Sequence, residues 1–349
     1  MASVTSIDLA PYYDVRAGRD ARGALIAAVD RALRDIGFLC IRGHPVPHAV
    51  IEQTQQMALQ FFDSDPPHKH SALAVRHRHR GYTPLGDIAL SYAMREGADP
   101  HPPDLFERYR IGPFDFADDP YHRARGDGAY APNVWPAGIA GFQSCISAYY
   151  RHMSGLSRDL MRIFAMALGL EERWFDPLID REMSSLCLNH YPAPQAEPLP
   201  GQLRAAAHTD YGTLTIVAST SAPGSLQVHT RDGRWETVVA EPGTFVVNIG
   251  DMMAQWTNDR WVSTLHRVAN PPVLEAQRSR RLSLVYFHQP NPDAVVSCIP
   301  TCLSDERPAR YGPVTAGDYI SRRIAMHFKS GAPPVPGGSA GRAAVGESP

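Results

Sequence analysis

The segment AAHTDYGTLTIV, residues 206–217, carries two side chains that can bind a metal, His208 and Asp210, at the head of an apolar, β-branched run. Alternate residues of a β-strand point to the same side of a sheet. The spacing therefore predicts one nitrogen and one oxygen ligand side by side. An H-x-D pair alone is weak evidence, because a polar loop that enters a strand can have the same sequence.

A third ligand would have to come from another strand, and the segment STLHRVAN supplies His266. Two histidines and one carboxylate form a ligand face that leaves open positions on Fe(II) for a co-substrate and O2. Zinc accepts the same atoms, but a redox-inert ion makes poor use of several open positions. Taken by itself, His266 is explained equally well as a hydrogen-bonded core histidine.

Two further polar pairs, Asn189 with Tyr191 and Arg281 with Ser283, show the same two-residue spacing in apolar segments. Polar pairs on the inner faces of such strands are costly unless they bind each other, a metal or a ligand. An arginine binds a carboxylate through two charge-assisted hydrogen bonds, and a neighbouring hydroxyl adds a third. The three pairs together predict one polar site inside a barrel.

The elements that would position these residues follow from the apolar periodicity. Helices are predicted over residues 21–36, ended by Gly37, over 48–64, and over 139–168 as one long helix or two in succession, ended by Gly169. Residues 66–135 are rich in Pro, His, Arg and Gly and are expected to form long loops. The short apolar segments that follow, each bounded by Gly, Pro, Asn or Asp, favour a β-sandwich or barrel.

Composition excludes several other classes of protein. The 349 residues carry a net charge of −2, and no basic stripe with interleaved aromatic residues indicates nucleic-acid binding. Neither a secretory signal nor an apolar run of membrane-spanning length is recognised, so no membrane partner is expected. The five cysteines are an odd number in mostly apolar contexts, which predicts reduced thiols and a cytoplasmic protein. Cys298 and Cys302 have no second pair nearby, so they make a poor zinc site.

The order of these motifs resembles that of the iron- and 2-oxoglutarate-dependent dioxygenases, in the branch related to isopenicillin N synthase and the plant flavonoid and ethylene oxygenases. The resemblance covers residues 4–330, and its motifs are N-x-Y-P at 189–192, H-T-D-x-G at 208–212, GSLQV, NIGDMM, STLHRV and R-L-S at 281–283. It implies a distorted double-stranded β-helix, or jelly roll, with a helical N-terminal region packed on it. Residues 1–135 would form that region and 136–330 the catalytic core, while the Pro/Gly/Ser-rich residues 331–349 are expected to be a disordered tail.

The resemblance also implies roles for the three pairs. His208, Asp210 and His266 would bind Fe(II), Arg281 and Ser283 would bind the distal carboxylate of 2-oxoglutarate, and Asn189 and Tyr191 would help to hold that co-substrate. The implied reaction is oxidation of an unactivated C–H bond of a small molecule of secondary metabolism, by hydroxylation, desaturation or cyclisation. O2 is consumed, and succinate and CO2 are released.

Two positions depart from the pattern of the family. Many relatives have Lys-Glu in the segment that here reads DLFERYRIG, where Phe106 precedes Glu107, so a charge near the mouth of the site is expected to be missing. The middle residue of N-x-Y is His190, whose side chain is expected to point away from the site.

Four residues are candidates for substrate contacts: Arg78, Arg80, Tyr82 and Phe287. We expect Arg78 or Arg80 to recognise an anionic substrate, with Tyr82 near the mouth of the site, although a solvated loop explains this basic run as well. Phe287 is a candidate for the apolar floor and an equally good core residue. Trp256 and Trp261 flank TNDR, which is expected to be a hairpin turn between two strands.

Two alternative functions stay open at this point. An oxidase of the isopenicillin N synthase type uses iron and O2 without 2-oxoglutarate, and there the R-x-S pair holds the carboxylate of the substrate itself. A barrel that binds a metal or a small acid without catalysis would have the same fold, because function depends on the site rather than on the scaffold.

Overall fold

The largest element of the structure, a computed structural model that describes residues 4–74, 79–90 and 102–329, is an eight-stranded sheet. Its strands, in spatial order, are β1 (Thr5–Asp8), β2 (Phe38–Arg42), β10 (Phe245–Ile249), β7 (Leu214–Ser219), β12 (Arg281–His288), β5 (Ser185–Tyr191), β4 (Glu107–Ile111) and β3 (Gly81–Thr83). All neighbours pair antiparallel except β1 and β2. The predicted strand segments of the second half therefore form the centre of one sheet.

A second, four-stranded sheet contains β6 (Ala205–His208), β11 (His266–Val268), β8 (Leu226–His229) and β9 (Trp235–Thr237). Its inner side packs on the large sheet in two apolar clusters. Val228 lies with Phe38 and Val246 in one cluster, and Ala205 lies with Phe106 in the other. The side chains between the two sheets therefore form one layer, and the three polar pairs predicted from the sequence lie in this layer. A small third sheet pairs β13 (Val295–Val296) with β14 (Val314–Thr315).

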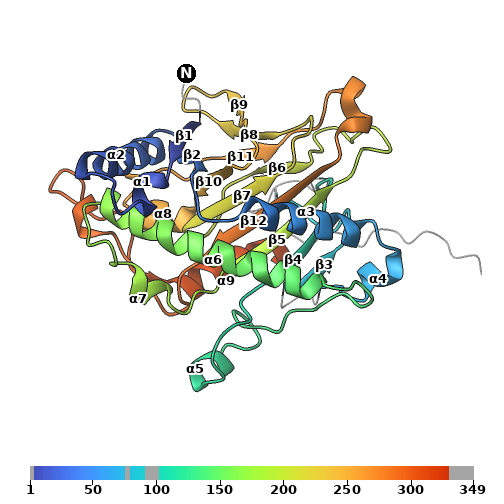
Figure 1. Cartoon of the computed structure of the whole chain (residues 1–349), viewed down its shortest axis with the longest axis horizontal. Helices are drawn as coiled ribbons and strands as arrows, with labels where there is room; N and C mark the ends of the chain where they lie inside the picture. Colours follow the sequence, from blue (N-terminus) through green and yellow to red (C-terminus); the bar gives the residue numbers. More distant parts are fainter. Residues whose placement is uncertain (1–3, 75–78, 91–101, 330–349) are drawn as a thin grey trace, which may run out of the picture.

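Helices cover the opposite face of the large sheet. The three long ones are α2 (Arg19–Asp35), α3 (His48–Phe62) and α6 (Phe142–Ala167), and α6 runs along the sheet in Figure 1. The apolar stripe of α6, including Met153, Leu160 and Phe164, is buried in the main core with Leu188 and Leu284 of the sheet. This burial follows from the three-and-four spacing of apolar residues on α6.

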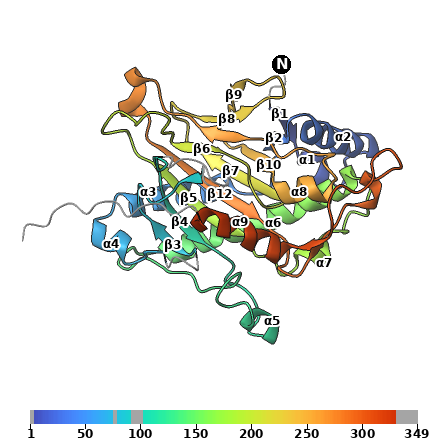
Figure 2. The same cartoon turned by 180° about the vertical axis from the view of Figure 1, so that it is seen from behind.

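The remaining helices are short or peripheral, and Figure 2 shows them from the other side. They are α1 (Ala10–Tyr13), α4 (Pro66–His70), α5 (Pro120–Arg123), α7 (Asp176–Ile179), α8 (Asp251–Trp256) and α9 (Ala316–Lys329), with 3-10 turns η2 (Val273–Arg278) and η3 (Pro300–Cys302). Among the described helices, none combines the length and the apolar character that crossing a membrane requires.

The predicted helices and the β-rich second half are confirmed. The helix predicted over 139–168 is the single helix α6, and Gly37 and Gly169 adopt φ of +68° and +73°, the left-handed conformation that ends a helix at low cost for glycine. The tail 331–349 lies outside the described residues.

Two expectations about local structure are wrong. Residues 66–135 are not only loops, because β3 and β4 extend the large sheet on the side of β5. Trp256 and Trp261 do not flank a hairpin turn. Trp256 ends the helix α8, and the positive φ values of Asn258 and Asp259 turn the chain after it. Both indole side chains are buried, as packing residues are.

Candidate active site

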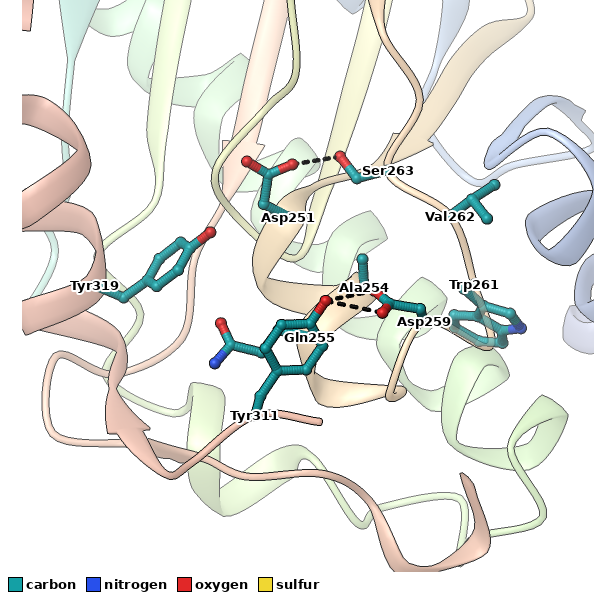
Figure 3. Close-up of a pocket in the computed structure, with 9 residues that line it drawn as sticks. All are labelled: Asp251, Ala254, Gln255, Asp259, Trp261, Val262, Ser263, Tyr311 and Tyr319. Atoms are coloured by element: carbon teal, nitrogen blue, oxygen red, sulfur yellow. Dashed lines mark hydrogen bonds between the residues drawn. The ribbon is translucent and has the colours of Figure 1, made fainter. Parts of the chain in front are cut away.

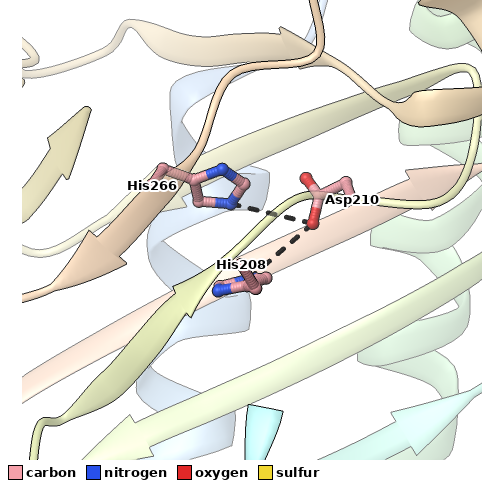
Figure 4. Close-up of side chains that lie close together, drawn as sticks. All are labelled: His208, Asp210 and His266. Carbon is pink, nitrogen blue, oxygen red and sulfur yellow. Dashed lines mark ion pairs between the residues drawn. The ribbon is translucent and has the colours of Figure 1, made fainter. Parts of the chain in front are cut away.

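The structure brings His208, Asp210 and His266 together between the two sheets. Their potential ligand atoms all lie within 4.8 Å of one another, and Asp210 and His266 are buried while His208 is partly buried (Figure 4). Asp210 Oδ1 is 3.9 Å from His208 Nε2 and 3.7 Å from His266 Nε2. These separations leave room between the three atoms for one ion.

The local fold explains how residues far apart in the sequence meet. His208 is the last residue of β6 and His266 the first of β11, and the two are opposite each other in the strand register. Asp210 is not on the strand with His208, as the alternating pattern suggested, because β6 ends at His208 and β7 begins only at Leu214. Its carboxylate is directed to the histidines from the turn.

Hydrogen bonds fix which nitrogen of each histidine faces the cluster. His208 Nδ1 donates to the carbonyl of Ala206 at 2.7 Å, and His266 Nδ1 donates to the carbonyl of Thr264 at 3.0 Å. A carbonyl can only accept, so each Nδ1 carries the proton and each neutral ring presents the lone pair of Nε2 to its neighbours. Burial lowers the pKa of His208, and the neighbouring His266 lowers it further, which keeps the ring neutral as a metal ligand must be.

Asp210 is oriented in the same way. Its Oδ2 accepts hydrogen bonds from Thr215 Oγ1 at 2.6 Å and Asn248 Nδ2 at 2.7 Å, so Oδ1 is the oxygen that faces the histidines. Burial alone would raise the pKa of Asp210, but the two histidines and these hydrogen bonds outweigh it and lower the pKa. The three residues therefore form an anionic, preoriented donor set that fits Fe(II).

A second polar group, around Arg281, lies on the face of the large sheet that is turned toward the His-Asp-His cluster. Arg281 stands opposite Tyr191, and Ser283 stands opposite Asn189, so the two predicted pairs are on neighbouring strands. Arg281 is 5% exposed, and it donates to Ser219 Oγ at 2.8 Å, which in turn lies 3.0 Å from Ser283 Oγ. Burial lowers the pKa of Arg281, and no carboxylate of the described residues forms an ion pair with it. A buried guanidinium of this kind suits an acidic ligand.

Asn189 and Tyr191 belong to the same polar group. Both are buried, Tyr191 lies under the guanidinium of Arg281 at 5.3 Å from its ring centroid, and Asn189 Oδ1 has no hydrogen-bond partner among the described residues. A buried amide oxygen without a partner costs free energy unless a ligand or water bonds to it.

His190, between them in sequence, lies on the other face of the sheet. Its Nδ1 is 2.8 Å from a carboxylate oxygen of Glu107, its Nε2 accepts from Arg280 Nε at 2.9 Å, and its ring stacks on Phe62 of α3. The expectation that His190 points away from the site agrees with this geometry.

The predicted substrate residues do not all lie near the His-Asp-His cluster. Arg78 lies outside the described residues. Arg80 is buried against Gly112, where a Cβ would lie 2.1 Å from Nη2, and it donates to the carbonyls of His79 and Ala129. Tyr82 donates to Glu107 under the helices. The structure does not bring Arg80 or Tyr82 to the cluster.

Phe287, by contrast, is on the face that carries the cluster. Its register partner on β7 is Thr215, the residue that bonds to Asp210. Phe287 is partly buried there, which is compatible both with the predicted apolar floor and with a packing role.

Sequence reasoning missed four side chains that shape this site. Thr215, Asn248 and Ser219 orient the predicted residues, and Arg108 of β4 presents a guanidinium 5.1 Å from the ring centroid of Phe106. The chain therefore carries a positive charge two residues after Phe106, at Arg108. The sequence did contain a signal for Arg108. The alternation of residue types in ERYRI, residues 107–111, predicts a strand, but this segment was assigned to loops.

A separate cavity of about 410 Å³ lies beside α8 and α9 (Figure 3). Its two carboxylates already have partners: Asp251 accepts from Ser263 at 2.7 Å, and Asp259 accepts from Tyr311 at 2.8 Å. These paired groups make it a weaker candidate for a reactive site than the His-Asp-His cluster.

Comparisons with known proteins match this geometry. The profile of the 2OG-Fe(II) oxygenase superfamily matches residues 183–290, and that of the N-terminal region of non-haem dioxygenases in morphine synthesis matches residues 4–138. The first match contains all seven residues of the two polar groups predicted from sequence.

Relatives extend the match to nearly the whole chain. The 2-oxoglutarate-Fe(II) type oxidoreductase hxnY of Emericella nidulans is 30% identical, over 90% of this chain and 87% of its own length. The proline hydroxylase buaE of Petromyces alliaceus is 31% identical, over 93% and 99%. The structure of a full-length Neurospora crassa protein in complex with alpha-KG superposes with a TM-score of 0.80 at 28% identity, over 93% of this chain and 96% of that one.

The chain therefore belongs to the 2OG-Fe(II) oxygenase superfamily. It is an oxidoreductase of the Fe(II)- and 2-oxoglutarate-dependent class with the predicted jelly-roll core, and the comparisons support this function over the 2-oxoglutarate-independent oxidase and the non-catalytic barrel.

Proposed function

We propose that His208, Asp210 and His266 bind Fe(II), and that Arg281 and Ser283 hold the distal carboxylate of 2-oxoglutarate. Asn189 and Tyr191 then contact the co-substrate between the iron and the Arg281–Ser283 pair. The observation that carries this assignment is the pairing of a preoriented His-Asp-His donor set with a buried guanidinium that has no carboxylate partner among the described residues.

The strand β7 connects the two ends of the proposed co-substrate site. Thr215 bonds to Asp210 and Ser219 bonds to Arg281, and these two residues lie on the same face of β7. Four residues of strand span about 13 Å between Cα atoms, which the inward-pointing side chains shorten. A five-carbon diacid is of suitable length to reach from a metal at one end to a guanidinium at the other.

Iron with 2-oxoglutarate and O2 supplies the oxidation of a C–H bond and the release of succinate and CO2. The protein's own residues orient the reactants and exclude water. Thr215 and Asn248 hold Asp210 so that one oxygen stays directed at the metal position. Phe38, packed at 5.4 Å against the ring of His266, and Phe106, packed at 5.3 Å against Tyr191, close the site with apolar surface.

We further propose an anionic small molecule of secondary metabolism as the substrate. A small molecule is supported by relatives such as the proline hydroxylase and the Neurospora crassa protein, which has been crystallised with thymine. An anion is supported by the guanidinium of Arg108 on the site face. A cytoplasmic location is supported by five cysteines that are all free thiols.

The test is an anaerobic titration of 2-oxoglutarate into the Fe(II)-loaded protein, followed by visible absorption. A weak charge-transfer band that saturates with 2-oxoglutarate is expected, together with succinate release when O2 and substrate are added. Bound iron with no band, and iron-dependent turnover without 2-oxoglutarate, would contradict the proposal.

A further inference from the structure

The strand β4 carries a second set of cations that the co-substrate does not need. Arg108 and Arg110 alternate with Glu107, Tyr109 and Ile111, and those three face the helices, where Tyr109 packs on Phe61 and Phe142. Both arginines therefore lie on the face that looks toward the four-stranded sheet.

The strand register aligns each arginine of β4 with one residue of β5 and one residue of β12, and these three residues form a row across the sheet. Arg108 is opposite Asn189, which is opposite Ser283, so Arg108 continues the row of residues proposed to hold 2-oxoglutarate. Arg110 is opposite Cys187, which is opposite Val285. The second row thus presents an apolar surface with a guanidinium at its end.

Among the residues that the structure describes, the two guanidinium groups have fewer partners than a structural role would give them. Arg108 stacks on Phe106, but it forms no hydrogen bond or ion pair with the described residues, and its buried Nε has no partner. Arg110 donates to Ser185 Oγ at 3.0 Å, and its Nε is also buried without a partner. Two neighbouring cations left in this state repel each other and cost free energy.

Burial raises the pKa of the neighbouring Asp104 and the charge of Arg108 lowers it, but this carboxylate forms no ion pair with Arg108 or Arg110. Asp104 is buried, and its two oxygens accept from the backbone N–H groups of Leu90 at 2.7 Å and Ala206 at 2.8 Å. Arg80, close behind Arg110, adds positive charge and is itself bound to carbonyl groups. Within the described part of the chain, Arg108 and Arg110 thus form no ion pair, and an anion from outside would supply one.

We propose that Arg108 and Arg110 bind an oxyanion of the substrate, while its apolar body lies over Cys187, Val285 and Phe287 toward the His-Asp-His cluster. This inference rests on the proposed function and names its substrate class, an acid with an apolar body. The strands β4 and β12 are separated only by β5, so the oxyanion site is about 10 Å of sheet away from the strand that carries Arg281. The two anions therefore occupy different places.

The experiment uses phenylacetate and phenyl phosphate as anionic probes and phenylacetamide as the neutral match. Each is titrated calorimetrically into the full-length Fe(II) protein under anaerobic conditions with saturating 2-oxoglutarate, which keeps the probes out of the Arg281 pocket. At least one anion is expected to bind tighter than the amide by roughly tenfold or more, because a charge-assisted hydrogen bond contributes that much. Tighter binding of phenylacetate would indicate a carboxylate substrate, and tighter binding of phenyl phosphate would indicate a phosphate substrate.

Variants assign the effect to residues. Arg108→Gln and Arg110→Gln are each expected to weaken anion binding about 10- to 100-fold and to leave phenylacetamide binding unchanged. Arg151→Gln, on an exposed part of α6 where it pairs with Asp115, is the matched control and is expected to change neither. The affinity for 2-oxoglutarate, read from the charge-transfer band, should change less than twofold in all three.

Equal binding of the anions and the amide to the wild-type protein would overturn the inference, and this comparison depends on no variant. A loss of 2-oxoglutarate affinity in Arg108→Gln would also overturn it, because Arg108 would then hold the co-substrate. Failure of 2-oxoglutarate to bind the wild-type protein would instead contradict the proposed function.

Discussion

The two faces of the large sheet use polar residues in opposite ways. On the face under the helices, Glu107 accepts from Tyr82 at 2.5 Å, lies 2.8 Å from His190 Nδ1 and pairs with Lys69 at 3.2 Å. On the face of the site, the neighbouring residues Arg108 and Asn189 each keep a buried polar atom that has no hydrogen-bond partner among the described residues. The Glu107 cluster is therefore satisfied within the protein, whereas the buried atoms of Arg108 and Asn189 are open to a ligand.

The same contrast separates two consecutive residues of the chain. Arg280 bonds to His190 and Asp63 on the helix face, and Arg281 bonds to the hydroxyl of Ser219 on the site face. The sequence RR at 280–281 gives no hint of this difference in chemistry. The alternation of the strand assigns the two side chains to different functions.

The strongest test of the comparison is Asp210→Ala. We expect loss of stoichiometric iron and turnover at background level, because only two neutral nitrogen ligands remain. Iron content after anaerobic reconstitution measures the first effect and succinate release the second. Circular dichroism should show an intact fold, and a variant that retains iron and activity would contradict the ligand assignment.

The second test compares Arg281→Gln with Arg280→Gln. Removing the buried guanidinium should cost about 2–4 kcal/mol of 2-oxoglutarate binding, or roughly 30- to 700-fold in affinity. The anaerobic absorption titration gives this value directly. Arg280→Gln should leave the titration unchanged, and a similar loss in both variants would mean that the two faces are not functionally distinct.

The third test, Thr215→Val, removes a hydrogen bond from the site face while conserving shape. Asp210 then loses one of the two donors to its Oδ2, and iron affinity should fall by about 10- to 100-fold. Competition with a metal-binding dye measures it. Unchanged affinity would show that Asn248 alone orients the carboxylate.

The smallest effect on catalysis is expected from Glu107→Gln on the helix face. It should lower stability by about 1–3 kcal/mol, seen as a lower Tm at pH 7, with the 2-oxoglutarate titration unchanged. A weakened titration would show that the two faces are coupled.

The stability effect of Glu107 should also depend on pH. Burial would raise the pKa of Glu107, but hydrogen bonds from His190 and Tyr82 and the charge of Lys69 lower it below its unfolded value of 4.5. The stabilisation is therefore complete above pH 4.5 and is lost as the pH falls through the folded pKa. The difference in Tm between wild type and variant should shrink under those conditions.

The sequence predicted the β-rich core, and it predicted which polar residues share a face wherever a strict two-residue period runs through apolar strands. Arg281 with Ser283 and Asn189 with Tyr191 are cases where the period alone defines the face. It did not predict Asp210 in a turn, because hydrogen bonds from Thr215 and Asn248, rather than strand alternation, orient that carboxylate. Arg108 was missed because β4 is only five residues long. The alternation over so few residues is too weak a signal beside the Pro/Gly-rich segments around it.

The strands β1 to β4, which come first in the chain, occupy both edges of the large sheet. A truncated protein beginning near residue 136 would therefore expose unpaired backbone along β10 on one side and β5 on the other. Open edges of this kind pair with other chains, so such a fragment should aggregate on expression even though it contains every proposed iron ligand. During synthesis β1 can pair with β2 and β3 with β4, but β2 waits for β10 and β4 waits for β5, which makes folding of the whole sheet slow and late.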